Sequence, residues 1–285
     1  MRNNKAFSLI ELSIVLIIIG FITAGITGGN SLIISARVAR AKRLSNSFMA
    51  GWGGAVPTMP VIWYDSTDTD YIDIDSDSKV SRLIDRTGRG HHATQTTSAN
   101  RPLYVKNSFN RLPAIDFNGS SQYLNYPNIG SSDVGTIFIV SKADSFSGAS
   151  SGLVHLFGTN DWASGSFHFA IDTASNKALS AVYGRTGNLV VYQTSVYALN
   201  TNYITTLVTG TTSSAFYTNR VSNGSSTHSQ TSFNLGEGVI GAYNSSSIIS
   251  RYWDGQIVEI IVFDEALNTS EREFVEDYLK IKWGI

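Results

Sequence analysis

The segment KAFSLIELSIVLIIIGF, residues 5–21, decides how the rest of the chain is organised. It opens a run of twenty almost wholly apolar residues, 7–26, in which Glu11 is the only charged side chain. Twenty helical residues at 1.5 Å each extend about 30 Å, the thickness of the hydrocarbon core of a bilayer. Arg2 and Lys5 precede the run, which by the positive-inside rule predicts a single-pass membrane helix with a cytoplasmic N-terminus.

Glu11 is the unexpected residue of this helix. A carboxylate at the bilayer centre costs about 2.5–3.5 kcal/mol on insertion scales. The hydrophobic pattern leaves two interpretations open: Glu11 is tolerated because it lies near the membrane interface, or it is kept for a function.

The residues KAFSLIEL, 5–12, resemble the processing site of type IV prepilins and of the related pseudopilins of type II secretion. The resemblance implies a prepilin peptidase that cleaves between Ala6 and Phe7 and methylates the new amino group of Phe7. Ala6 stands where the family usually has glycine, and its small side chain is expected to permit processing. The resemblance also gives Glu11 an assembly role. Its carboxylate would pair with the Phe7 amine of a neighbouring subunit, which has a pKa of about 8 and is mostly cationic at neutral pH.

Composition separates the N-terminal segment from the rest. Residues 1–50 hold six Lys or Arg against one acid, whereas the remaining residues hold fifteen against twenty-one. The chain of 285 residues is 42% hydrophobic, enough for one sizeable domain and a smaller element. It contains no cysteine, which excludes a disulfide framework, a thiolate metal site and a cysteine nucleophile.

The helix is expected to continue beyond the membrane. Apolar residues recur at helical spacing on one stripe: Ile34, Val38, Ala41, Leu44 and Phe48. A pilin buries such a helix in the filament core, although the basic residues on its other faces are equally consistent with contacts to lipid phosphates. The stretch AGWGGAVPTMP, 50–60, cannot continue a helix. We therefore predict a leader at 1–6, an assembly helix at 7–49, a linker at 50–60 and a domain at 61–285.

Beyond residue 61 the pattern is that of a β-sandwich. Short apolar or alternating runs are separated by Gly, Asn, Ser and Asp, and they lie at 136–143, 152–159, 166–172, 178–184, 189–196, 203–210 and 256–264. In SFHFAID, 166–172, the alternation predicts a buried face with Phe167 and a wet face with Ser166 and His168. A closing helix follows, with capping-box spacing from Ser270 to Glu273.

Four stretches of this domain resemble concanavalin A-like, laminin-G-type jelly-roll domains: IWYD (62–65), VSRLIDRTGRGHHATQ (80–95), LPAIDFNGS (112–120) and WDGQIVEIIVFD (253–264). Ile84 and Thr87 replace the family's usual Trp and Ser at one turn. The resemblance implies a mainly-β jelly-roll sandwich with a C-terminal helix. It also implies a binding module for carbohydrate or protein, often with calcium.

Calcium is the one cofactor that the sequence indicates. Asp73, Asp75 and Asp77 begin like an EF-hand loop, but Ser78 stands in the place of its glycine and Ile84 in the place of its bidentate glutamate. A solvated acidic loop is the alternative. Asp116 and Asp254 are further candidate ligands, because the resembled family has acids there.

An enzyme is not expected. Glucanases on this fold carry paired glutamates on one strand, and the segment YIDID, 71–75, lacks both. The chain has no Gly-x-Ser-x-Gly elbow and no phosphate-binding glycine loop.

These patterns favour a minor-pilin-like or pseudopilin-like subunit of a type IV pilus or type II secretion filament that presents a jelly-roll binding domain for adhesion or recognition. The alternative is a structural pseudopilin whose sandwich contacts only neighbouring subunits, and a glycan-cleaving enzyme is the least favoured. The expected partners are prepilin peptidase, other pilin-type subunits, the bacterial inner membrane and a glycan or surface protein, but not nucleic acid. The domain is expected in the periplasm or on an extracellular pilus.

Overall fold

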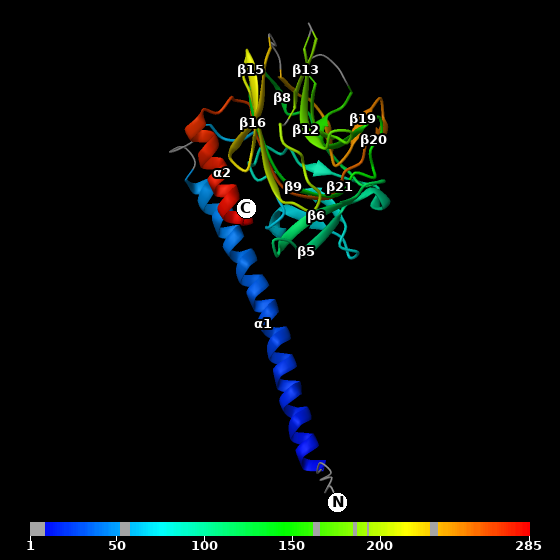
Figure 1. The fold of residues 1–285 in the computed structure, drawn as a ribbon, viewed down its shortest axis with the longest axis vertical. Coiled ribbons are helices and arrows are strands. Elements are labelled where there is room, and N and C mark those ends of the chain that lie inside the picture. Colours follow the sequence, from blue (N-terminus) through cyan, green and yellow to red (C-terminus); the bar gives the residue numbers. More distant parts are fainter. Residues whose placement is uncertain (1–8, 52–57, 162–165, 185–186, 193, 229–232) are drawn as a thin grey trace, which may run out of the picture.

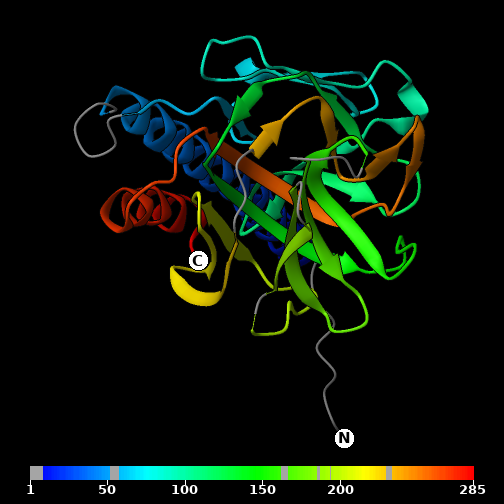
Figure 2. The ribbon, with the colours of Figure 1, turned by 90° about the horizontal axis from the view of Figure 1, so that it is seen from above.

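The chain folds into a long N-terminal helix joined to a β-rich domain (Figure 1). The computed structural model describes residues 9–51, 58–161, 166–184, 187–192, 194–228 and 233–285, with 9–11, 20–28, 30, 177–184 and 187–192 described by their backbone alone. Helix α1, Leu9–Ala50, is continuous through Gly25, Gly28 and Gly29 and extends far beyond the domain. Helix α2, Thr269–Trp283, lies beside the end of α1 on one side of the sandwich (Figure 2).

Eight strands of the described residues form the first sheet, in the order β16-β15-β14-β9-β21-β6-β5, with β1 paired to β21. Their bounds are β1 Ile62–Asp65, β5 Leu103–Phe109, β6 Leu112–Asn118, β9 Gly135–Ser145, β14 Tyr203–Thr209, β15 Ser213–Thr218, β16 Val221–Thr227 and β21 Asp254–Phe263. The long strand β21 pairs with β9 along one edge and with β6 and then β1 along the other.

The second sheet has nine strands in the same described ranges, in the order β13-β12-β11-β10-β18-β7-β4-β3-β2. Their bounds are β2 Ile72–Ile74, β3 Val80–Leu83, β4 Ala93–Thr94, β7 Leu124–Tyr126, β10 Leu153–Thr159, β11 Phe167–Asp172, β12 Lys177–Gly184, β13 Gly187–Tyr192 and β18 Gly238–Ile240. Shorter elements are the ribbons β8 Gly130–Ser132 with β17 Phe233–Leu235 and β19 Tyr243–Ser245 with β20 Ile248–Ser250, and the 3-10 helices η1 Thr69–Tyr71 and η2 Ser98–Asn100. The predicted mainly-β sandwich with a C-terminal helix is confirmed.

Two hydrophobic cores hold these layers together. One fills the space between the sheets, and the other lies between the first sheet and the helices. Neighbouring residues of β9 alternate between them, with Ile137 and Ile139 in the first core and Phe138 and Val140 in the second. Because both faces of the central strands are covered, their sequences read as continuous apolar runs rather than as an alternation.

The predicted wet face of residues 166–172, on which the alternation also placed Asp172, is wrong at Ser166 and His168. Ser166 and His168 are buried as completely as Phe167. The ring of His168 lies 5.5 Å from that of His155 and 5.4 Å from that of Tyr243, on the ribbon β19–β20. A hairpin more than seventy residues later in the chain therefore covers this face, which local alternation cannot predict. Burial lowers the pKa of His168 to about 3, so the ring is neutral at physiological pH.

The capping box of α2 begins two residues earlier than predicted. The side chain of Asn268 accepts hydrogen bonds from Ser270 N at 2.9 Å and Glu271 N at 3.1 Å, and Glu271 accepts one from Asn268 N at 2.8 Å. Asparagine suits the extended N-cap conformation as well as serine does, and Glu271 stands at the required third position.

The N-terminal part of α1 stands clear of the domain. Its side chains from Leu12 to Ile19 are apolar apart from Ser13, and those apolar side chains are 46–62% exposed. Among the helices of the described residues, none has the length and apolar character needed to span a membrane. The span expected over residues 7–26 stays a prediction.

Candidate functional site

The last turns of α1 dock onto the sandwich and α2, and we call this contact the junction. The ring of Phe48 stacks on Tyr278 of α2 at 4.1 Å and meets Trp63 of β1 edge-on at 5.7 Å. Ala41 and Phe48 are buried in the second core. The apolar stripe predicted on this helix therefore exists, and its C-terminal part packs on the chain's own domain. A stripe identifies a buried face but not what covers it.

Three charged side chains are fully buried beneath the junction. The ammonium of Lys282 on α2 lies 2.7 Å from Asp65 Oδ1 on β1 and 2.8 Å from Glu259 Oε2 on β21. A buried charge is stable only when its partners replace water, and removing one partner of such a pair typically costs about 3–5 kcal/mol. These three residues, which we call the junction network, join the first strand, the last strand and the last helix.

Glu259 is the common acceptor of the junction network. Trp63 Nε1 and Tyr278 OH donate to its Oε1 at 2.7 Å each, and Trp283 Nε1 donates to its Oε2 at 2.6 Å. An indole N–H can only donate, so both tryptophans need an acceptor when they are buried. The Glu259 carboxylate, on the helix-facing side of β21, accepts a hydrogen bond from each of the two indoles.

Polar contacts extend the junction network to α1. Ser45 donates to Asp65 Oδ2 at 2.8 Å, and its hydroxyl lies 3.0 Å from that of Tyr278. The guanidinium of Arg86 lies 3.0 Å from Asp68 Oδ2 and 3.8 Å from Asp65 Oδ2. Lys42 of α1 reaches Asp68 at 2.7 Å. The docking of α1 is therefore fixed by directional contacts as well as by apolar packing.

The two buried carboxylates differ in their ionisation. Burial opposes the charge of Asp65, but Lys282 and Arg86 outweigh it and hold the pKa of Asp65 at about 2. Burial raises the pKa of Glu259 above its usual value, and Lys282 offsets part of this effect. Asp65 therefore stays ionised in acid in which an ordinary aspartate takes up a proton.

The predicted processing and assembly residues are not placed by these contacts. Ala6 and Phe7 lie outside the described residues, as does the predicted leader. The backbone of Glu11 belongs to α1, but its side chain lies outside the described part. Most of the predicted linker, 52–57, also lies outside it.

Two of the three acids proposed as calcium ligands on β2 and its turn, Asp73 and Asp75, have protein partners. Asp73 pairs with Arg82 at 2.8 Å. Asp75 accepts hydrogen bonds from the backbone N–H of Asp77 at 3.0 Å and of Lys79 at 2.9 Å, and it pairs with Arg101 at 3.0 Å. These contacts form a turn that Asp75 holds closed, while Asp77 remains exposed.

The other two acids lie on the first sheet. Asp116 is on β6, where burial and then nearby Asp144 raise its pKa. Asp254 begins β21 and accepts a hydrogen bond from Ser147 Oγ at 3.0 Å. Within the described ranges, no group of three or more His, Cys, Asp or Glu side chains is arranged to hold a metal ion. Calcium binding stays a prediction.

The sequence interpretation missed the junction network. A signal was present, because Glu259 interrupts the apolar run QIVEIIVF and Lys282 stands beside Trp283 in the last turn of the chain. A charge within a strand that is buried on both faces requires a buried partner. The pairing itself depends on the fold, since Asp65 and Lys282 are far apart in the sequence.

Comparison with family models finds a known motif at the N-terminus. A model described as the prokaryotic N-terminal methylation motif matches residues 1–27. This motif implies processing by prepilin peptidase and assembly with other pilin-type subunits. Comparison with curated protein sequences gave no match.

Comparison with solved structures supports the β-sandwich. Domain 4 of AbnA, a GH43 extracellular arabinanase from Geobacillus stearothermophilus, in complex with arabinotriose, is 15% identical with a TM-score of 0.55, over 77% of this chain and 97% of that domain. A sialidase from Trypanosoma rangeli is 12% identical with a TM-score of 0.51, over 78% of this chain and 33% of that chain. A mutant of NanB sialidase from Streptococcus pneumoniae is 17% identical with a TM-score of 0.45, over 56% of this chain and 26% of that chain. The chain thus spans about a third or less of these sialidases, and the likeness shows the fold alone.

The pKa of Asp65 predicts an acid-dependent contribution to stability. A carboxyl with a pKa of about 2 when folded and about 3.9 when unfolded stabilises the protein above pH 4 and loses this effect as the pH falls towards 2. The lost stabilisation is about 2 kcal/mol. Urea unfolding of the full chain in detergent should show Asp65→Asn less stable than wild type at pH 5, with the gap about 2 kcal/mol smaller at pH 2.

Asp77→Asn, which alters an exposed acid, is the control and should show no such change. A gap between wild type and Asp65→Asn that is the same at both pH values would contradict the ionised state of buried Asp65.

Proposed function

We propose that this chain is a minor-pilin-like or pseudopilin-like subunit of a type IV pilus or type II secretion filament. The observation that carries the proposal is the union of a methylation motif with a 42-residue helix whose far end is docked into a β-sandwich. In this proposal the helix anchors the subunit in the inner membrane and then in the filament. The sandwich is displayed in the periplasm or on the pilus.

The exposed surface of α1 supports an assembly role. The apolar side chains at six consecutive positions, from Ile14 to Ile19 and so on all sides of the helix, are 46–62% exposed. A helix that is apolar all round is normally buried in lipid or among other helices. A membrane before assembly and a bundle of neighbouring helices after assembly would each supply that cover.

Glu11 is the proposed assembly signal. Cleavage between Ala6 and Phe7 would leave a methylated, cationic amino group four residues before Glu11. In an apolar surrounding, a carboxylate and an amine attract each other strongly and each needs a partner. A carboxylate on an incoming chain that meets the amine of a neighbour would fix the axial register of the new subunit.

The sandwich is the proposed recognition domain. We assign it to the concanavalin A-like, laminin-G-type jelly rolls on the four stretches of sequence that resemble them, and the β-sandwich of the structure is compatible with this assignment. Its ligand would be a glycan or a surface protein. Calcium, held by acids among Asp73, Asp75, Asp77, Asp116 and Asp254, is a proposed cofactor of such binding.

Replacement of Glu11 tests the assembly proposal. Glu11→Val removes the carboxylate from an apolar helix, so insertion and processing should continue while incorporation into filaments is lost. The measurement is the fraction of subunit in sheared filaments, with mass spectrometry of the N-terminus to detect methylated Phe7. Ser13→Val, on the same helix, should incorporate normally. Filaments that contain Glu11→Val at the wild-type level would contradict the proposal.

A glycan array tests the recognition proposal. The full chain in detergent is the appropriate sample, because Ser45 and Phe48 of α1 are part of the buried junction. Reproducible binding to a glycan is expected, and loss of binding in chelator would assign calcium to the site. Absence of binding with calcium and with chelator would contradict glycan recognition and favour a subunit whose sandwich contacts only its neighbours.

A further inference from the structure

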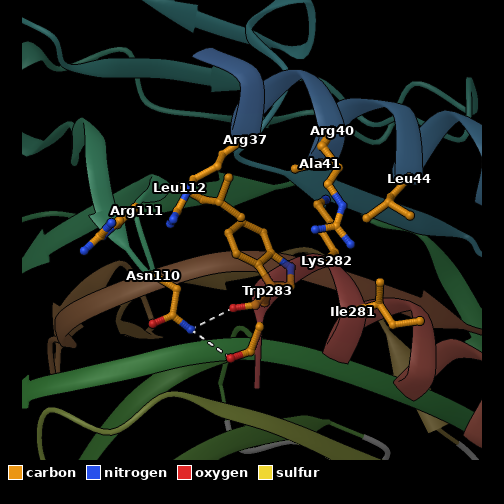
Figure 3. Close-up of a pocket in the computed structure, with 11 residues that line it drawn as sticks. Arg37, Arg40, Ala41, Leu44, Asn110, Arg111, Leu112, Ile281, Lys282 and Trp283 are labelled. Atoms are coloured by element: carbon orange, nitrogen blue, oxygen red, sulfur yellow. Dashed lines mark hydrogen bonds between the residues drawn. The ribbon is translucent and has the colours of Figure 1, made fainter. Parts of the chain in front are cut away.

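An open groove of about 480 Å³ lies where α1, the turn between β5 and β6, and the end of α2 meet (Figure 3). Arg37 and Arg40 line it from α1, Arg111 from the turn, and Ile281 and Trp283 from α2. None of its eleven described lining residues is acidic. The groove is therefore cationic, on a domain that is acidic as a whole.

The three arginines are available for a ligand. Each is exposed, and within the described residues none of them makes an ion pair. The fourth cation of the groove, Lys282, is already neutralised by Asp65 and Glu259. Guanidinium groups bind phosphate and carboxylate through paired N–H donors.

The end of α2 does not account for these arginines. Its last carbonyls attract cations, but Asn110 Nδ2 donates to Trp283 O at 2.7 Å and to Gly284 O at 3.2 Å, as Figure 3 shows. The N–H of Gly284 donates to Lys280 O at 2.9 Å. The helix end is thus capped by groups other than the arginines.

Arg111 occupies a position that normally favours glycine. Asn110 and Arg111 form the two-residue turn between β5 and β6 with φ of 48° and 66°. Such turns prefer Asn followed by Gly, because a side chain at positive φ strains the backbone. An arginine kept there, with its side chain on the groove, points to a use for its charge.

The position of the groove along α1 indicates which anion it meets. From Leu9 to Ala36 the helix has only one charged residue, Glu11, and it extends about 42 Å at 1.5 Å per residue. This length matches the roughly 40–45 Å thickness of a bilayer with its headgroups. Leu32 and Ile33, just before Arg37, are 72% and 52% exposed. Arg37 and Arg40 are the first cations of α1, and a bilayer around Leu9–Ala36 would place them at the level of the outer headgroups.

We propose that this groove binds the phosphate of an anionic phospholipid headgroup at the membrane surface. The inference rests on the proposed membrane-anchored subunit and adds a second lipid contact, made where the end of the helix meets the domain. Arg37, Arg40 and Arg111 hold the phosphate between the helix and the sandwich. The contact fixes the orientation of the domain on the bilayer before assembly and is lost when the subunit leaves the membrane.

The absence of cysteine from the chain allows a single probe to test this site. Ile281→Cys, an exposed position in the groove, carries a fluorophore, and the full chain is reconstituted into phosphatidylcholine vesicles with a headgroup-linked quencher. Adding increasing fractions of phosphatidylglycerol should quench the probe. A probe at Ile248→Cys, exposed on the ribbon β19–β20, is the reference and should respond little.

Each of Arg37→Gln, Arg40→Gln and Arg111→Gln should raise the phosphatidylglycerol fraction at half-maximal quenching about fivefold, since a basic residue near an anionic surface contributes about 1 kcal/mol. Arg43→Gln, which removes the same charge from α1 outside the groove, should change it little. Arg111→Gly also relieves the positive φ, so a loss of quenching with an unchanged or higher Tm excludes misfolding as the cause.

Several outcomes would overturn the site. Equal quenching in pure phosphatidylcholine would show that the groove does not bind the anionic headgroup. An unchanged phosphatidylglycerol fraction at half-maximal quenching in all three variants would show the same. A change in the fluorescence of the probe when inorganic phosphate is added to pure phosphatidylcholine vesicles would assign the groove to free phosphate. Groove variants that reduce filament incorporation but leave quenching unchanged would assign it to an acidic neighbour. A chain that alkaline extraction removes from the vesicles would contradict the membrane anchor and, with it, this site.

Discussion

The carboxylate of Glu259 lies out of reach of water between the ammonium of Lys282 and the indole N–H groups of Trp63 and Trp283. Its charge is acceptable there only because every donor around it is present and correctly placed. Those donors come from β1 and α2, and Glu259 itself comes from the central strand β21. Asp65, the second acceptor of Lys282, carries the same arrangement to α1 through Ser45. Elements at opposite ends of the chain are thereby brought together at one buried point.

The buried contacts around Glu259 and Asp65 also fix how helix α1 is attached to the sandwich. The methylation motif matches residues 1–27, at the start of the long helix, and the junction attaches the other end of that helix to the sandwich by stacking of Phe48 on Tyr278 and by hydrogen bonds of Ser45. Described side chains before Arg37, such as Leu32 and Ile33, are exposed, whereas Ala41 and Phe48 belong to a core of the domain. In the proposed subunit, this attachment would transmit the position of the helix directly to the domain.

Local sequence predicted the strands well where burial was uniform. The runs that became β9, β14 and β21 are apolar because the second sheet covers one face and the helices cover the other, so their pattern needs no knowledge of the partner. His168 was predicted to face solvent but is buried. The ribbon that covers it comes from residues 243–250, which the local alternation cannot reveal. Asn268 was missed as the cap because Asn268 with Glu271 and Ser270 with Glu273 have the same capping-box spacing.

The candidate sites also divide into those that a local motif predicts and those that depend on tertiary contacts. Ala6, Phe7 and Glu11 were predicted from a short motif, and such a prediction needs no tertiary contact. Asp75 was singled out by acid density, and the structure shows that its carboxylate closes a turn and pairs with Arg101. The pairing of Asp65 and Glu259 with Lys282 and the groove that Arg37, Arg40 and Arg111 line depend on long-range packing. The spacing of these residues along the sequence does not indicate that the fold brings them together.

The central claim is that the end of α1 is part of the folded domain and not a tethered helix. Amide hydrogen exchange of the full chain in detergent tests it most directly, by comparing residues 41–50 with β21. If the junction holds, these two segments share a high protection and lose it together as denaturant is raised, because they open as one cooperative unit. Residues 41–50 that exchange as rapidly as an isolated helix, while β21 remains protected, would contradict the account.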